Sequence, residues 1–321
     1  MRIFLLYLIC IIGAMGVMLV GYFLYVPQKN SNSRFLSPLP DFLTIALNKQ
    51  VTLLDLWSPF IKQAKGDENS IPSFTAHSVL IYDLTTDKTL FEYQPQLHLP
   101  MASLTKIMTA TISLENKRPD DRYVVSSQNL VGEDSMGLST GEVMDETDLL
   151  YGLMLPSGND AAEVLATDSP FGRTGFIKAM NDKARALGLT DTVFSNPSGL
   201  QGDGTQYTTA LDLLVMTRYA MDTYPLFAKV VSTYEYDIPQ TEDHKAYQLF
   251  NETNLLTSYP GVKGVKTGYT PEAGLCLVTY LDYKGHRIIG IILDSEDRRE
   301  EMKMFLDYSL KEIGITPPTH Q

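Results

Sequence analysis

The chain has 321 residues, 44% apolar and 20% charged, which excludes a disordered chain and provides a core for one large domain or two small ones. Its 38 Asp and Glu residues outnumber the 26 Lys and Arg residues, so the net charge is −12. No nucleic acid is therefore expected as the main partner, because phosphate binding requires a basic face.

The chain begins with an apolar segment. Residues 3–26 contain no charged side chain and would span roughly 36 Å as a helix, which is enough to cross a bilayer. Small residues near position 14 leave a cleaved signal peptide as an alternative, but the apolar run continues to Val26. We therefore expect residues 1–26 to form one transmembrane helix that anchors the protein in the membrane.

Residues 27–70 are predicted to be a linker or stalk, because they contain four prolines and polar stretches at both ends. A stripe of apolar residues at near-helical spacing runs through them: Leu43, Leu47, Leu54, Trp57 and Ile61. This stripe could lie on the membrane surface or pack against the following domain, and the sequence leaves both possibilities open. The globular domain is expected to cover residues 71–321.

The globular part has strand patterns at both ends and helical patterns between them. The expected strands are Thr75–Asp83, Lys88–Gln94, Ala273–Leu281 and His286–Leu293, with turns at Leu84–Asp87 and Asp282–Gly285. The expected helices are an amphipathic one through Phe176, Met180, Ala184 and Leu187, a second over Thr208–Met221, and a closing one over Asp297–Lys311. This order predicts an antiparallel sheet that carries a helical insertion, within the α/β (α+β) class.

The first of three short motifs is Ser103-Leu104-Thr105-Lys106, which has the form S-x-x-K. On a helix, positions i and i+3 share a face, so the hydroxyl and the amine can meet. A serine hydroxyl is a weak nucleophile until a neighbour takes its proton. A lysine can take it only if burial or a second cation lowers its pKa. Alone the motif proves little, because about one S-x-x-K is expected by chance in a chain of this length.

The second and third motifs lie further along the chain. Ser157-Gly158-Asn159 follows a proline in a turn pattern that could point a hydroxyl and an amide into a cleft, although alone it is better explained as a helix N-cap. Lys266-Thr267-Gly268 supplies a cation and a hydroxyl, and its glycine leaves room for a substrate backbone at an edge strand. Lys-Thr-Gly occurs by chance in about one chain in ten. The joint occurrence of the three motifs therefore indicates a shared site.

With these motifs the chain resembles the low-molecular-mass penicillin-binding proteins that act as D-alanyl-D-alanine carboxypeptidases, over residues 74–310. Other segments similar to that family are residues 100–110, Asp148–Met154, Asn196–Leu200, Asn254–Leu256, and Gly264–Thr270 with Ala273-Gly274. The resemblance implies the β-lactamase and penicillin-binding transpeptidase-like fold, in which helices and a helical subdomain flank an antiparallel sheet.

The resemblance also implies an acylation and deacylation cycle on peptidoglycan stem peptides. Ser103 would attack the carbonyl between two D-alanines, Lys106 would act as the general base, and Ser157 would relay the proton to the leaving amine. The implied substrate-binding residues are Asn159, Lys266, Thr267, Gly268, Tyr269 and Arg299. The backbone N–H groups of Ser103 and Tyr269 would form the oxyanion hole.

β-Lactam antibiotics are expected to acylate the same serine, as covalent inhibitors that mimic the D-Ala-D-Ala end. Because the implied substrate lies outside the cytoplasm, the domain is expected on the extracytoplasmic side of a bacterial cell membrane. One implied residue is ambiguous, since Arg298 lies beside Arg299. Either arginine could instead pair with a neighbouring glutamate on a solvated helix face.

Three other functions are compatible with parts of this pattern. A class A β-lactamase is disfavoured, because no Glu between Asn159 and Lys266 has an Asn four residues later, and Glu252 has Asn254 at the wrong spacing. A DD-endopeptidase uses the same residues, so the motifs do not separate it from a carboxypeptidase. A catalytically idle peptidoglycan-binding protein is disfavoured, because all three motifs are intact.

Residues that commonly bind metals show no ligand pattern. The two cysteines, Cys10 and Cys276, lie far apart, which excludes a disulfide framework and a cysteine-based zinc site. The five histidines are scattered, at His77, His98, His244, His286 and His320. We therefore expect no metal and no cofactor.

Overall fold

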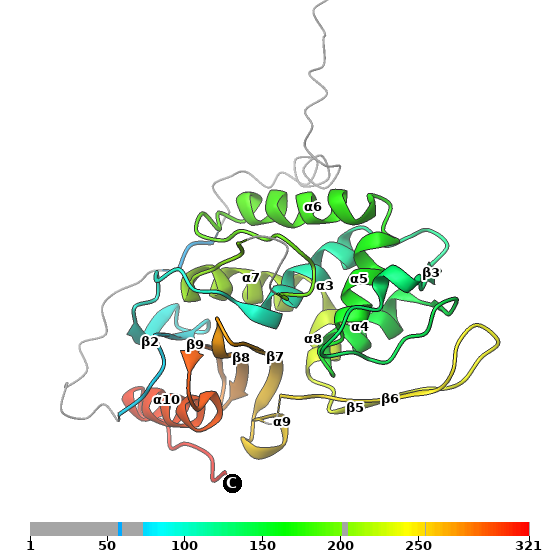
Figure 1. The fold of residues 1–321 in the computed structure, drawn as a ribbon. Coiled ribbons are helices and arrows are strands. Elements are labelled where there is room, and N and C mark those ends of the chain that lie inside the picture. Colours follow the sequence, from blue (N-terminus) through cyan, green and yellow to red (C-terminus); the bar gives the residue numbers. More distant parts are fainter. Residues whose placement is uncertain (1–56, 60–72, 201–204, 254, 321) are drawn as a thin grey trace, which may run out of the picture. The chain divides into compact units, whose positions relative to one another are not determined.

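The computed structural model describes residues 57–59, 73–200, 205–253 and 255–320 (Figure 1). Its strands are β1 (Ser78–Asp83), β2 (Lys88–Tyr93), β3 (Tyr123–Val124), β4 (Val143–Met144), β5 (Glu235–Ile238), β6 (Tyr247–Phe250), β7 (Val262–Thr270), β8 (Gly274–Tyr283) and β9 (His286–Ser295). Its α-helices are α3 (Lys106–Glu115), α4 (Glu146–Met154), α5 (Asn159–Thr167), α6 (Gly172–Ala186), α7 (Ala210–Thr223), α8 (Pro225–Val231), α9 (Leu255–Ser258) and α10 (Arg298–Glu312). Two 3-10 turns are η3 (Ala102–Thr105) and η4 (Ser127–Asn129).

Five strands form one antiparallel sheet in the order β2-β1-β9-β8-β7. Three pairs, β1–β2, β7–β8 and β8–β9, are sequential hairpins, and the β1–β9 pairing joins the beginning of the domain to its end. In the β8–β9 turn, Lys284 and Gly285 both have positive φ, +48° and +84°, as a two-residue turn matched to the strand twist requires. The strand β7 lies at an edge of the sheet and leaves one side of its backbone unpaired within it.

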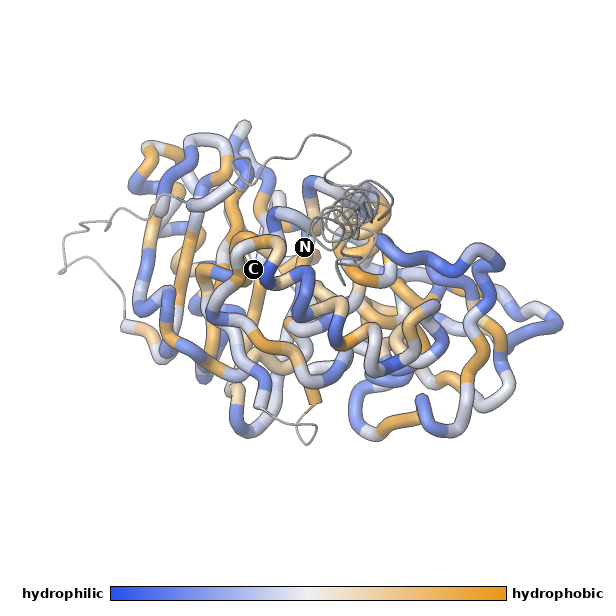
Figure 2. Tube along the Cα trace, turned by 90° about the horizontal axis from the view of Figure 1, so that it is seen from above, coloured by the Kyte–Doolittle hydropathy of each residue, from blue (hydrophilic) through white to orange (hydrophobic). Residues whose placement is uncertain are grey.

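The two faces of the sheet are covered by different layers. Alternate residues of β1 point to opposite faces, so Leu80 and Tyr82 join one buried cluster while Val79 and Ile81 join the other. Helix α10 covers the second face and contributes Phe305 to it. The larger cluster, on the first face, includes residues of α3, α4, α5, α6 and α7. Figure 2 shows hydrophobic stretches alternating with hydrophilic ones along the chain.

The predicted elements are present with small shifts at their ends. The strand predicted from Thr75 begins at Ser78, and the second hairpin turns at Lys284-Gly285 because β8 continues to Tyr283. The closing helix begins one residue later than predicted. Its first predicted residue, Asp297, is instead the N-cap, and its carboxylate accepts a hydrogen bond from the N–H of Glu300 at 3.2 Å.

A short described segment before the domain packs against it. The indole N–H of Trp57 donates to Asp87 Oδ1 at 3.0 Å, and its ring meets Tyr82 edge-on with centroids 5.5 Å apart. The guanidinium carbon of Arg218 lies 4.1 Å from the centre of the Trp57 ring. At Trp57, the apolar stripe of the predicted linker therefore packs on the following domain.

The predicted transmembrane helix and most of the predicted linker lie outside the described residues. Within the described ranges, no helix combines the length and apolar character that crossing a bilayer requires.

Candidate active site

The S-x-x-K motif lies at the junction of η3 and α3. Ser103 is in the 3-10 turn and Lys106 is the first residue of α3. A 3-10 turn has three residues per turn, so positions i and i+3 lie directly above one another. Accordingly, Lys106 Nζ lies 2.8 Å from Ser103 Oγ. The predicted contact is confirmed, although a 3-10 turn rather than a regular α-helix brings the two side chains together.

The environment of Lys106 favours the neutral amine. The side chain is fully buried, and its Nζ is 2.7 Å from Asn159 Oδ1 and 2.7 Å from the carbonyl oxygen of Ser198. Burial, and then the nearby charge of Lys266, hold the pKa of Lys106 well below its usual range. A neutral amine has two hydrogens for these two acceptors. Its lone pair is then left for the hydroxyl proton of Ser103.

The second motif is held in a tight turn between α4 and α5. Ser157 has a φ of +60°, unusual for a residue other than glycine, and two backbone hydrogen bonds fix the turn on either side. Gly158 N donates to the Gly152 carbonyl, and Asn159 N donates to the Asp134 carbonyl, both at 2.9 Å. The helix N-cap is Gly158 and has no side-chain cap bond, so the N-cap interpretation of Ser157 is wrong.

The Ser157 hydroxyl is buried, and among the described residues it has no hydrogen-bond partner. A buried hydroxyl without a partner costs free energy unless a bound molecule satisfies it. This hydroxyl therefore has its hydrogen-bonding capacity left for a bound ligand. The predicted catalytic role of Ser157 stays a prediction.

The third motif lies on the edge strand β7, as its residues predicted. A Cβ at Gly268 would come within 3.1 Å of the backbone nitrogen of Ser103, so the glycine lets the strand approach η3 closely. The following residue, Tyr269, has 60% of its side chain exposed. The backbone of β7 at Gly268 therefore lies beside the turn that carries Ser103. The oxyanion hole predicted there, from the N–H groups of Ser103 and Tyr269, stays a prediction.

Lys266 is the second buried lysine of the site and is only 1% exposed. Among the described residues, its ammonium donates one hydrogen bond, to the Thr267 carbonyl at 3.1 Å, and pairs with no carboxylate. Burial lowers its pKa to about 8, and the charge of Arg298 adds to this effect while that of Glu252 opposes it. Lys266 is therefore mostly charged at neutral pH, whereas the Lys106 amine is the more readily neutral one.

The structure brings Arg298, and not Arg299, to the β7 strand. Arg298 Nη1 donates to the carbonyls of Gly268 at 2.6 Å and Cys276 at 3.3 Å. Arg299 has 41% of its side chain exposed, and its Nε lies 3.6 Å from Glu300. Adjacent helical residues point about 100° apart. The placement of α10 on the sheet therefore decides which arginine faces the site, and the assignment to Arg299 needs this correction.

Two parts of the site were not assigned from the sequence. The Ser198 carbonyl binds Lys106, and the turn that carries it is stabilised by the side-chain oxygen of Asn196, which accepts from Gly199 N at 2.7 Å. The pattern Asn-Pro-Ser-Gly is a turn signal that could have indicated this loop. Gly199 has a φ of +93°, and a Cβ there would lie 2.0 Å from the Ala102 carbonyl oxygen, so only glycine fits beside η3.

The other unassigned part is the loop between η4 and β4, which packs against the start of α5. The buried carboxylate of Asp160 accepts hydrogen bonds from the N–H groups of Met136 at 3.0 Å and Leu138 at 2.9 Å. It also accepts from Ser135 Oγ at 2.5 Å. This carboxylate shapes the loop whose Asp134 carbonyl holds the start of α5. Its neighbour Asn159 is thereby placed against Lys106.

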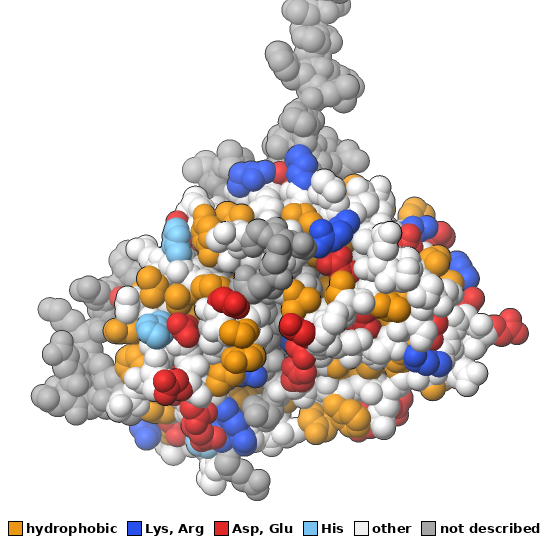
Figure 3. All heavy atoms as spheres, in the orientation of Figure 1, with side chains coloured by type: hydrophobic (Ala, Val, Ile, Leu, Met, Phe, Trp, Pro, Cys, Tyr) orange, Lys and Arg blue, Asp and Glu red, His pale blue; other side chains and the backbone are white. Residues whose placement is uncertain are grey.

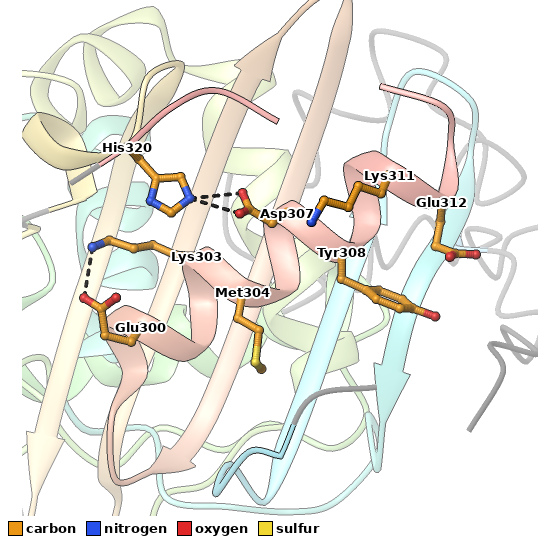
Figure 4. Close-up of a pocket in the computed structure, with 8 residues that line it drawn as sticks. All are labelled: Glu300, Lys303, Met304, Asp307, Tyr308, Lys311, Glu312 and His320. Atoms are coloured by element: carbon orange, nitrogen blue, oxygen red, sulfur yellow. Dashed lines mark hydrogen bonds and ion pairs between the residues drawn. The ribbon is translucent and has the colours of Figure 1, made fainter. Parts of the chain in front are cut away.

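A separate surface pocket lies along α10, on the other face of the sheet from η3. It is lined by Glu300, Lys303, Met304, Asp307, Tyr308, Lys311, Glu312 and His320, and Figure 4 shows the His320 ring directed at the Asp307 carboxylate. None of the three motifs lines this pocket. In the described part of the chain, no three side chains of the metal-binding types gather as a metal site.

The fold and the geometry define a class of enzyme. A serine hydroxyl and a buried lysine meet beside an edge strand that carries a second buried lysine, and a second serine lies in the turn before Asn159, which contacts the first lysine. This is the arrangement of a serine acyl-transferring peptidase. The family model described as D-alanyl-D-alanine carboxypeptidase matches residues 65–297. The chain belongs to this family of penicillin-binding serine peptidases.

Relatives and solved structures agree with this membership. The chain is 32% identical over 269 residues to D-alanyl-D-alanine carboxypeptidase DacF of Bacillus subtilis, covering 81% of this chain and 68% of that protein. It is 33% identical over 241 residues to a D-alanyl-D-alanine endopeptidase of Escherichia coli, covering 73% and 76%. The crystal structure of the Streptomyces K15 DD-transpeptidase matches with a TM-score of 0.70 and 31% identity, over 75% of this chain and 99% of that one. An ampicillin-bound penicillin-binding protein D2 from Listeria monocytogenes matches with a TM-score of 0.64 and 27% identity, over 74% and 98%.

Proposed function

We propose that this protein removes the terminal D-alanine from peptidoglycan stem pentapeptides through an acyl-enzyme on Ser103. Its oxygen forms an ester bond to the carbonyl carbon between the two D-alanines as the C–N bond breaks. Lys106 accepts the hydroxyl proton, and Ser157 passes a proton to the amine of the departing D-alanine. Water then hydrolyses the ester and regenerates Ser103.

The observation that carries this proposal is the position of Lys106. Its amine lies 2.8 Å from Ser103 Oγ, and its two other contacts are the acceptors Asn159 Oδ1 and the Ser198 carbonyl. These contacts leave the serine hydroxyl as the proton donor to the amine. Lys266 and Thr267, together called the carboxylate subsite below, would recognise the C-terminal carboxylate. Arg298 would support this subsite through the Gly268 carbonyl.

Covalent labelling tests the nucleophile. A penicillin mimics the D-Ala-D-Ala end and should add its mass to the tryptic peptide that contains Ser103. The Ser103→Ala variant should show no adduct, while the Ser58→Ala variant, at an exposed serine outside the site, should label as the wild type does. Stoichiometric labelling of Ser103→Ala would mean that another residue is the nucleophile.

A DD-endopeptidase activity is the second candidate function. It is favoured by the similarity to proteins named D-alanyl-D-alanine endopeptidases, one of them 34% identical over 227 residues. Mass spectrometry of muropeptides after incubation with the enzyme separates the two activities. Loss of one D-alanine from pentapeptides identifies a carboxypeptidase, whereas conversion of cross-linked dimers to monomers identifies an endopeptidase.

We also propose that residues 1–26 anchor the protein in the bacterial cell membrane and that the domain lies outside the cytoplasm. The uncharged run over residues 3–26 and the extracytoplasmic location of peptidoglycan support this placement. Protease added to intact, wall-stripped cells should degrade the domain and spare cytoplasmic markers. A protected domain would contradict this placement.

A further inference from the structure

Glu252 is a charged residue at the active site that the proposed reaction does not use. It lies between β6 and α9, where its backbone N–H donates to the Leu155 carbonyl at 3.1 Å, two residues before Ser157. Thr267 Oγ1 donates a long hydrogen bond of 3.4 Å to Glu252 Oε2. Glu252 therefore joins the turn of the second motif to the strand of the third.

The position of Glu252 is held firmly by its neighbours, although its own side chain is exposed. Asn251 is buried and donates to the carbonyls of Val231 at 3.2 Å and Thr233 at 3.0 Å. Its side-chain oxygen accepts from the N–H of Thr253, which is also buried, at 2.8 Å. The backbone is thus fixed while the carboxylate, at the surface, is free to turn.

The charges around Lys266 make this carboxylate important. The buried ammonium faces two other cations, Lys106 from α3 and Arg298 from α10. The carboxylates that act on it are Glu252 and Asp134, the latter on the loop between η4 and β4. Both carboxylates belong to exposed residues at the rim of the site, and acidic side chains are visible across the middle of the face in Figure 3.

We propose that Glu252 is the internal counter-ion of the carboxylate subsite. While the site is empty, its carboxylate accepts a hydrogen bond from the Thr267 hydroxyl and balances the positive charge of Lys266. The substrate carboxylate then displaces it. This inference rests on the proposed function. Two carboxylates cannot share one hydroxyl donor without repulsion, so the exposed Glu252 side chain must turn away when substrate binds. Glu252 is thus a specificity-determining residue that disfavours weakly bound carboxylates.

Replacing Glu252 by Gln keeps the shape and removes the charge, which gives two separable effects. At pH values where Lys266 is fully charged, the variant lacks the Glu252 carboxylate that competes with the carboxylate of the ligand. Acylation by penicillin should therefore become roughly two- to fivefold more efficient. Where Lys266 begins to lose its proton, the loss of the opposing charge should move the alkaline limb of the pH profile down. A shift of roughly half a unit to one unit is expected, because the carboxylate is at an exposed rim.

The experiment measures the second-order rate constant of acylation by a fluorescent penicillin from about pH 6 to about pH 10. It uses the full-length wild type, Glu252→Gln, Glu252→Asp and the control Glu242→Gln. Glu242 is an exposed acid in the β5–β6 hairpin turn, outside the subsite. Its replacement by Gln changes the net charge by the same amount as Glu252→Gln. The Glu242→Gln profile should match the wild type, and Glu252→Asp should restore most of it.

An unchanged alkaline limb in Glu252→Gln would overturn the inference, as would an equal shift in Glu242→Gln. A uniform loss of rate at all pH values would also overturn it, because it would indicate a structural role only. Failure of the wild type itself to be acylated would instead contradict the proposed function. The two failures are therefore distinguishable.

Discussion

Lys106 and Lys266 carry the same side chain into one buried site, but their contacts differ. The Lys106 amine has three oxygen neighbours within 2.8 Å, one of them the proposed nucleophile. Among the described residues, the Lys266 ammonium donates to one acceptor, the carbonyl of Thr267 on the edge strand. The first arrangement suits proton transfer and the second suits attraction of an anion.

Replacing Lys106 by Arg should abolish most activity. A guanidinium stays charged at working pH and cannot accept the Ser103 proton. Acylation by penicillin and hydrolysis of D-Ala-D-Ala should both fall by about 10²–10⁴-fold, the range for a lost general base. Lys266→Arg retains the cation and should keep part of both activities. Equal losses in the two variants would show that the roles are not divided in this way, and far-UV circular dichroism checks that both fold.

Activity and stability should respond to pH in opposite directions just above neutrality. Lys266 has a pKa of about 8 in the fold against 10.5 in the unfolded chain, so the folded state binds fewer protons between these values. Stability therefore rises with pH through this window. Over the same range the subsite loses its charge, so acylation should decline. Above about pH 9, burial of the Cys276 thiol, which raises its pKa to about 12, has the opposite effect on stability.

The measurement is the melting temperature and the acylation rate between about pH 7.5 and about pH 9. The melting temperature should increase while the rate falls. In Lys266→Met the increase should be smaller, because only the lowered pKa of Lys106 then remains to produce it. A wild-type melting temperature that falls over this range would contradict the burial of two readily neutral lysines.

Residue patterns predicted the chemistry of the site better than its supporting contacts. The three motifs predicted the serine that contacts a buried amine and the buried cation on the edge strand, because these are side chains in short motifs of fixed spacing. The Ser198 carbonyl could not be predicted this way, since every residue has such an acceptor and only the fold selects one. The choice between Arg298 and Arg299 depended on how α10 is rotated on the sheet, which sequence periodicity does not determine.

Among the elements, the turn beside η3 is the most constrained, and Gly199→Ala should damage the site. The residue has a φ of +93°, and the new Cβ would lie 2.0 Å from the Ala102 carbonyl oxygen. The backbone before Ser103 must then move. We expect a loss of roughly 2–4 kcal/mol in the free energy of unfolding and a large loss of acylation.

Gly285→Ala provides the matched control for this change. Gly285 also has a positive φ, +84°, but a Cβ there would meet no atom within 4 Å. It should cost about 1–2 kcal/mol by backbone strain and leave acylation unchanged. Urea unfolding and penicillin labelling measure the two quantities. Full acylation of Gly199→Ala would mean that this turn does not set the position of Ser103.

For the molecule as a whole, the sheet separates a region that mainly stabilises the fold from the region that contains the site. Phe305 of α10 is fully buried, with its ring centroid 4.7 Å from that of Phe91 and 5.2 Å from that of Phe74. Phe305→Ala should lower the free energy of unfolding by about 3–5 kcal/mol. The acylation rate per folded molecule should not change, because η3 and α3 pack against the opposite face.

Urea unfolding and active-site titration with penicillin check this separation. A matching drop in the acylation rate of the folded fraction would show that the α10 layer controls the site through more than the Arg298 contact with β7. The antiparallel sheet was predictable from the strand patterns at both ends of the domain, whereas its strand order was not. Which face packs against α10 and which against the site helices was not predictable. It follows from the alternate residues of β1 and β9, which enter different buried clusters in the structure.

The packing of Trp57 gives the protein a spectroscopic reporter. Trp57 is the only tryptophan in the chain, so the whole indole emission comes from one contact between the segment before the domain and Tyr82, Asp87 and Arg218. Detachment of that segment would expose the indole to water and shift its emission to longer wavelength, without any added label. In a vesicle-bound preparation, the same signal would reveal whether the segment stays attached while the catalytic domain works on its substrate.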